Sequence, residues 1–94
     1  MENLKEKLFE GCVVKFENLF YLIYTNGMFV GNSIATSLKD YYNNDLTCQL
    51  FNDESVVGIY RLLLPVHLSA LYHEDYYGYE KDEILETIWE RDEQ

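Results

Sequence analysis

Proline, cysteine and positive charge are scarce in this sequence. Its 94 residues include one proline, two cysteines and seven basic residues, against 17 acidic residues. Two cysteines are too few for the disulfide framework of a small secreted domain, which favours a reducing, cytoplasmic location. The net charge of −10 excludes duplex nucleic acid and anionic membranes as favoured partners, because both would repel the protein.

The motifs of catalysis and metal binding are missing as well. The sequence contains no G-x-S-x-G, no glycine-rich phosphate loop, no H-E-x-x-H and no C-x-x-C pair. His67 and His73 lie six residues apart, which is the wrong spacing for one helical face. Cys12 is expected to be a small core residue. We therefore expect no enzymatic activity, no metal and no cofactor.

One long uncharged stretch, residues 18–38, has the length of a membrane span. Asn26 and Gly27 interrupt it near the middle, and four polar residues follow closely. Asn-Gly between two apolar runs is a strong signal for a tight hairpin turn. The stretch therefore predicts two buried strands joined by a turn.

Apolar residues are abundant, at 48% of the chain, with 16% aromatic residues. This composition supports the core of a single domain, residues 1–94. Alternating and apolar β-rich runs predict four strands, near 12–17, 19–25, 28–32 and 56–62. Gly58 is expected to be a bulge or a point of close approach. Residues 66–82 are expected to form a helical or irregular insertion, in which Gly78 would end the helix.

The final stretch, residues 84–92, allows two interpretations. A helix would gather its apolar side chains in one stripe of Ile84, Leu85, Ile88 and Trp89. However, acidic residues at the end of a helix oppose its dipole, and a small barrel needs a closing strand. We therefore predict a strand at 87–92 after a helical turn at 82–85. The expected fold is mainly β (β or α+β), a small barrel of about five strands with a short helical insertion before the last.

Four short motifs carry a family resemblance. They are a G-x-V-V-x-x-x-N strand at 11–18, a Y-N-D-D-L-T-like loop at 42–47, a V-Y-R-type strand at 56–61 and I-W-E-R at 88–91. In this order they resemble small phage-encoded SH3-like barrel proteins of mostly unknown function. The resemblance implies an SH3-like barrel and a phage or prophage origin. It implies no activity and no catalytic residue, and residues 62–82 depart from its pattern.

Negative charge is concentrated in residues 74–94. Nine acidic residues there are opposed by Lys81 and Arg91, so this segment carries −7 of the net charge of −10. Several tyrosines are interleaved with the acids. One interpretation is a solvated surface whose tyrosines cover a small core. The other is a recognition surface, because spaced carboxylates imitate phosphates and tyrosines supply rigid contact area.

The recognition hypothesis predicts a binding surface for a host protein with a basic surface. Its residues are Asp40, Tyr41, Tyr42, Asp45, Glu74, Asp75, Tyr76, Tyr77, Tyr79, Glu80, Asp82 and Glu83. The expected function is inhibition of a nucleic-acid-handling or defence protein, as an anti-CRISPR or other anti-defence protein acts. The alternative is a structural or assembly module, either a homodimer or larger homo-oligomer or a phage accessory subunit. Its interface would use apolar residues such as Phe20, Phe29 or Leu62.

Overall fold

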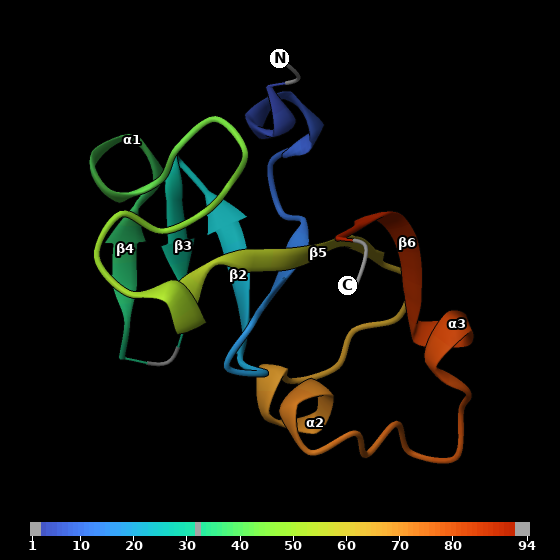
Figure 1. The fold of residues 1–94 in the computed structure, drawn as a ribbon. Helices are drawn as coiled ribbons and strands as arrows, with labels where there is room; N and C mark the ends of the chain where they lie inside the picture. Colours follow the sequence, from blue (N-terminus) through green and yellow to red (C-terminus); the bar gives the residue numbers. More distant parts are fainter. Residues whose placement is uncertain (1–2, 32, 92–94) are drawn as a thin grey trace.

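The computed structural model describes residues 3–31 and 33–91 and consists mainly of one antiparallel sheet (Figure 1). The sheet has six strands in the order β4-β3-β2-β1-β5-β6. They are β1 (Val13–Phe16), β2 (Tyr21–Thr25), β3 (Met28–Val30), β4 (Ala35–Ser37), β5 (Val56–Leu62) and β6 (Leu85–Glu90). The prediction of a mainly β, barrel-like small fold is confirmed.

The described residues also form five short helices, which lie before or between the strands. They are η1 (Leu4–Lys7), α1 (Leu38–Tyr41), η2 (Asn52–Glu54), α2 (Leu68–Tyr72) and α3 (Lys81–Ile84). The predicted helical insertion is present as α2 and α3, but Gly78 does not end its helix. Instead α2 ends at Tyr72, because Glu74 turns to a positive φ of 57°. Within the described residues no helix is long and apolar enough to cross a membrane.

The turn between β2 and β3 is the Asn-Gly hairpin that the sequence predicts. Thr25 pairs with Met28, so Asn26 and Gly27 are the two loop residues. Their φ values of 54° and 75° are both positive, as a type I′ turn requires. Residues 18–38 therefore fold back on themselves as adjacent strands.

Strand β4 is absent from the sequence-based prediction, which places no strand between residues 32 and 56. Ala35 pairs with Val30 and Ser37 with Met28. The strand has three residues without a large apolar side chain, so neither alternation nor β-branched enrichment reveals it. The strand lies at the edge of the sheet, where natural strands are often very short.

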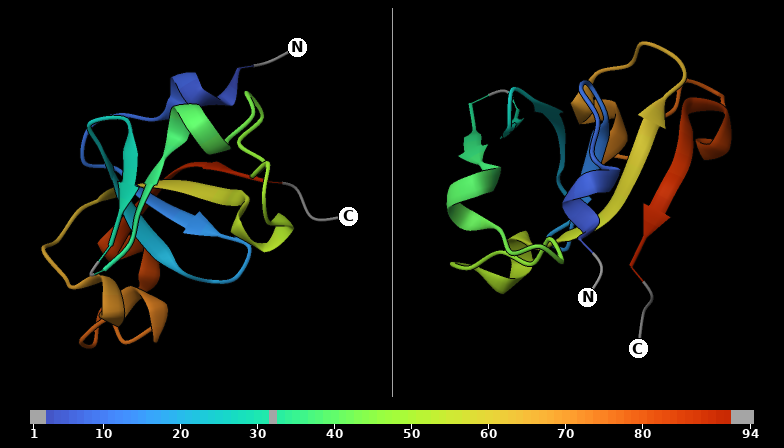
Figure 2. Two further views of the ribbon diagram at one scale, coloured as in Figure 1. Left: turned by 90° about the vertical axis from the view of Figure 1, so that its left-hand side faces the viewer. Right: turned by 90° about the horizontal axis from the view of Figure 1, so that it is seen from above.

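Strand β6 lies at the opposite edge from β4 and does not have the expected role of closing a barrel. It pairs with β5, from Leu62 opposite Leu85 to Gly58 opposite Glu90. Figure 2 (right) shows β4 and β6 on opposite sides of the molecule. The strand starts two residues before the predicted residue 87, directly after the helical turn α3. Residues 32 and 92, where two predicted strands end, lie outside the described residues.

The central strands β1 and β5 are buried on both faces of the sheet, and each face has its own core. Val14, Phe29 and Ile59 belong to the inner core enclosed by the bent sheet. Val13 and Tyr60 point the other way and pack with buried residues of the insertion and β6, namely Leu71, Ile84 and Leu85. Successive strand residues face opposite sides, so neighbours such as Val13 and Val14 serve different cores. The insertion is thus part of the packed structure.

Gly58 is a point of close approach, as predicted. A Cβ atom there would lie 2.4 Å from the hydroxyl oxygen of Tyr60. The Tyr60 ring is fully buried, and its hydroxyl donates to the Glu90 carboxylate over 2.6 Å. The glycine therefore leaves room for the ring that joins β5 to β6.

Candidate partner-binding surface

The acidic loop, residues 74–83, connects α2 to the end of α3 and is shaped by local hydrogen bonds. The Asp75 amide donates to Ala70 over 2.8 Å, and the Asp75 carboxylate accepts from the Tyr77 amide over 3.3 Å. Tyr77 and Gly78 then adopt positive φ values of 56° and 88°. These turns carry the chain away from the sheet and back to it, as the loop between α2 and α3 in Figure 1 shows.

The second half of the loop is held by a capping box on α3. The Glu80 amide donates to the Glu83 carboxylate over 2.8 Å, which ties the start of the helix to its first turn. Asp82 lies between them and is exposed. An open hollow of about 440 Å³ lies beside this turn and is lined mainly by polar residues of α3 and β6.

Seven of the twelve predicted binding residues are exposed together on this loop. They are Glu74, Asp75, Tyr77, Tyr79, Glu80, Asp82 and Glu83. Tyr76 belongs to the same segment but is half-buried and packs against the outer core, which includes Tyr21. Burial raises the pKa of Tyr76, so this phenol stays neutral. Its role in the structure is to anchor the loop.

The predicted patch in the central loop does not join this surface. Tyr42 is only 2% exposed, and its hydroxyl donates to the Glu54 carbonyl over 2.7 Å, so its predicted place on the surface is wrong. The Asp45 carboxylate accepts hydrogen bonds from the amide and hydroxyl of Thr47, and these lower its pKa. Asp40 and Tyr41 are exposed on α1, which lies at the opposite end of the molecule from α2 (Figures 1 and 2).

Three of the motifs that carry the phage resemblance meet in space. The Arg91 guanidinium, at the end of the I-W-E-R motif, donates to the Asp45 carbonyl over 2.8 Å and to the Val56 carbonyl over 2.9 Å. Leu46 in the same central loop is fully buried. These motif residues therefore have structural roles.

Arg91→Ala should lower the free energy of unfolding by about 2 kcal/mol, because two carbonyls lose a charged donor that links β6 to the central loop. Urea unfolding followed by circular dichroism measures the change. The control is Arg61→Ala, which removes an exposed guanidinium paired with Glu86 over 2.9 Å and should cost well under about 1 kcal/mol. Equal effects would contradict the structural role of Arg91.

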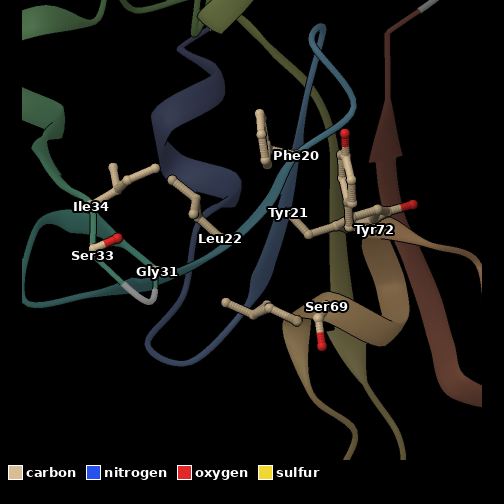
Figure 3. A pocket seen from close by; sticks show the side chains of 9 residues that line it. Phe20, Tyr21, Leu22, Gly31, Ser33, Ile34, Ser69 and Tyr72 are labelled. Atoms are coloured by element: carbon tan, nitrogen blue, oxygen red, sulfur yellow. The ribbon is translucent and has the colours of Figure 1, made fainter.

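A second surface feature, an apolar groove beside α2, is not predicted from the sequence (Figure 3). It contains a hollow of about 230 Å³ whose walls include Phe20, Leu22, Ile34 and Tyr72. Its residues come from three parts of the chain: the start of β2 with the preceding Phe20, the turn that follows β3, and α2. No local sequence pattern therefore brings them together. The only sequence signal is the apolar character of Phe20.

The other two residues considered for an apolar subunit interface lie inside the fold. Phe29 is fully buried in the inner core. Leu62 is half-buried and packs against the outer core. Only Phe20 of the three is exposed, so the interface proposed from the sequence loses two of its three members.

The chemical groups of metal centres are dispersed in this fold. Cys12 and Cys48 are both buried free thiols, and burial raises the pKa of Cys12. Among the described residues no group of three or more His, Cys, Asp or Glu side chains could hold a metal ion.

Comparison of the chain with protein-family models, with curated proteins and with solved structures produced no match.

Proposed function

We propose that this protein binds a protein with a basic surface through the acidic loop and inhibits it by occlusion. The observation that carries the proposal is the exposure of five carboxylates and two phenol rings on one ten-residue loop. Lys81, the basic residue of that loop, is half-buried beside the Tyr60 ring and lies 3.9 Å from the Glu90 carboxylate. The outward charge of the loop is therefore negative.

The target class follows from this charge. Grooves that hold nucleic acid are lined with Lys and Arg, and carboxylates spaced along a loop present them with a phosphate-like pattern. We infer a DNA-mimic mode of action on a nucleic-acid-handling or defence protein of the host, of the anti-CRISPR or anti-defence type. The sequence resemblance to phage proteins is the support for a phage setting. In this proposal the protein works in the host cytoplasm without touching nucleic acid or performing chemistry.

A paired charge reversal tests the proposal. Glu74→Lys combined with Asp82→Lys changes two exposed carboxylates that have no capping role, so the fold should be retained. Capture of basic nucleic-acid-handling proteins from a bacterial lysate, identified by mass spectrometry, should fall at least about tenfold, because each reversal turns attraction into repulsion. Capture by the unaltered protein should also weaken between low and high salt.

The matched control reverses two exposed acids at the opposite end of the molecule, Glu6→Lys with Asp40→Lys. Each variant replaces two negative charges by two positive ones, so both carry −6 in place of −10. The control should capture the same proteins as the unaltered chain. Equal loss in both variants would mean that net charge decides capture, and undiminished capture by the acidic-loop variant would overturn the proposal.

An assembly module is the second candidate, and one observation favours it. Strands β4 and β6 are both sheet edges, and exposed edges can pair with another copy of the chain. Such a homodimer would persist at high salt because backbone hydrogen bonds and apolar contacts would hold it. Sedimentation at several protein concentrations in high salt separates this candidate from the first.

A further inference from the structure

The apolar groove is larger than its main hollow. A second hollow of about 160 Å³ shares Phe20, Leu22 and Ile34 with the first, so the two hollows adjoin at these side chains. In Figure 3 Ile34 lies at one side, Tyr72 at the other, and Leu22 and Phe20 between them. Each hollow is smaller than the roughly 300 Å³ at which small-molecule pockets begin. A single large side chain is the size of occupant that this space suits.

The walls of the groove are exposed yet ordered. Phe20, Ile34 and Tyr72 are 44%, 48% and 42% exposed. The rings of Phe20 and Tyr72 stack with centroids 4.8 Å apart and an angle of 12° between their planes. Tyr72 is held in place by its neighbour Leu71, which is buried in the outer core. An incoming side chain would therefore meet a platform that needs little ordering.

Acidic residues line the groove at one place and follow a lining residue in the chain at another. Glu54 lines the second hollow. Tyr72, which lines the first hollow, is followed two and three residues later by Glu74 and Asp75, the first residues of the acidic loop. A cation also lies beside the lining, because the Lys15 ammonium is 5.7 Å from the Tyr21 ring centroid. The rim carries more negative than positive charge.

We propose that the groove receives one apolar or aromatic side chain from a cationic segment of the target protein. Lys or Arg residues on either side of that anchor contact Glu54 and the Glu74–Asp75 pair. A second copy of this chain is the less suitable occupant, because its charge of −10 would be brought against an acidic rim. This inference rests on the proposed function, since both use the acids that follow α2.

Three acetylated, amidated heptapeptides test the two requirements separately. KKGWGKK has an aromatic anchor and flanking cations, KKGSGKK keeps the cations alone, and EEGWGEE keeps the anchor alone. In an amide NMR titration at low salt, KKGWGKK should shift the amides of Leu22, Ile34 and Tyr72. It should bind about tenfold more tightly than KKGSGKK, because burial of one large apolar side chain is worth that much. EEGWGEE should not bind.

Two matched variants test whether the tryptophan side chain of KKGWGKK binds in the groove. Ile34→Asp places a charge in the groove at an exposed position. It should reduce the affinity for KKGWGKK to that for KKGSGKK. Leu50→Asp makes the same kind of change at an exposed residue that does not line the groove, and should leave the affinity unchanged. Circular dichroism of both variants verifies that the fold is retained.

Several results would overturn the proposal that the groove binds an anchor side chain. Equal affinity for KKGWGKK and KKGSGKK, with shifts confined to the acidic loop, would leave the acidic loop as a binding surface without an anchor site. Binding of EEGWGEE as tight as that of KKGWGKK would remove the charge preference. Concentration-dependent shifts of the Ile34 and Tyr72 amides without peptide would identify a second copy as the occupant. If neither cationic peptide binds and charge reversal leaves capture intact, the proposed function fails too.

Discussion

Above pH 10 the free energy of unfolding should fall by about 4 kcal/mol per pH unit, because three buried tyrosines keep their protons in the folded state. Burial raises the pKa of Tyr21, Tyr42 and Tyr60, and for Tyr60 the hydrogen bond to the Glu90 carboxylate adds to the effect. Unfolding returns each phenol to an ordinary pKa of about 10. The unfolded chain then binds three fewer protons at these phenols, so this stability is present below pH 10 and is lost as the pH rises. The raised pKa values of Tyr76 and Cys12 act in the same direction.

Two optical signals measure this loss. Absorbance at 295 nm counts tyrosinates, and far-ultraviolet circular dichroism follows the fold through the same titration. Exposed tyrosines such as Tyr77 and Tyr79 should ionise first, and the buried three should ionise only as the fold is lost. Tyr42→Phe should reduce the pH slope by about one third, whereas Tyr77→Phe should leave it unchanged. Ionisation of all nine tyrosines in one step while the fold persists would contradict the burial of these phenols.

The parts of the fold that could be predicted from the sequence are those with a local signal. Asn26 and Gly27 specify their own backbone conformation, so the β2–β3 hairpin follows from two adjacent letters. Alternation in the first strand separates Val14 and Phe16 from Val13 and Lys15, and the structure retains this division. The alternation could not show that Val13 is also buried, because the segment that covers it comes about fifty residues later in the chain.

The residues that the sequence misplaces depend on long-range packing. Tyr42 lies among polar and acidic neighbours, and composition therefore favours a surface position. Its ring instead packs edge-on against Phe29 and Phe16 in the inner core, and Glu54 supplies a partner for its hydroxyl. A tyrosine has both an apolar body and a polar tip, so its environment decides between core and surface.

The candidate site also has one part that is local in the sequence and one part that depends on long-range packing. The acidic loop is continuous in sequence, so its charge and its tyrosines could be recognised before the fold was known. The apolar groove joins Phe20, Ile34 and Tyr72, which are separated by up to fifty-two positions, and only the packing of α2 against β2 brings them together. Of a recognition surface made of both parts, the sequence therefore predicts the acidic loop and does not predict the apolar groove.

Leu71→Ala should lower the free energy of unfolding by about 3 kcal/mol and the melting temperature by about 15 °C. Leu71 is 1% exposed and packs with Val13, Tyr60 and Ile84. Truncation leaves a cavity in the outer core, where residues of the insertion, the sheet and β6 pack together. Differential scanning calorimetry measures the shift, and Leu63→Ala, at an exposed leucine of the same segment, should change stability by less than about 0.5 kcal/mol.

Hydrogen exchange on the Leu71→Ala variant distinguishes two ways in which the outer core can weaken. If the outer core belongs to the cooperative unit, the amides of β1, β5 and α2 lose protection together, by the amount that calorimetry gives. If α2 alone exchanges freely while β1 and β5 keep their protection, the insertion opens independently and the predicted global loss is wrong. The first result would mean that the acidic loop and the apolar groove are held with the stability of the whole fold, because Tyr72 and Glu74 immediately follow this leucine.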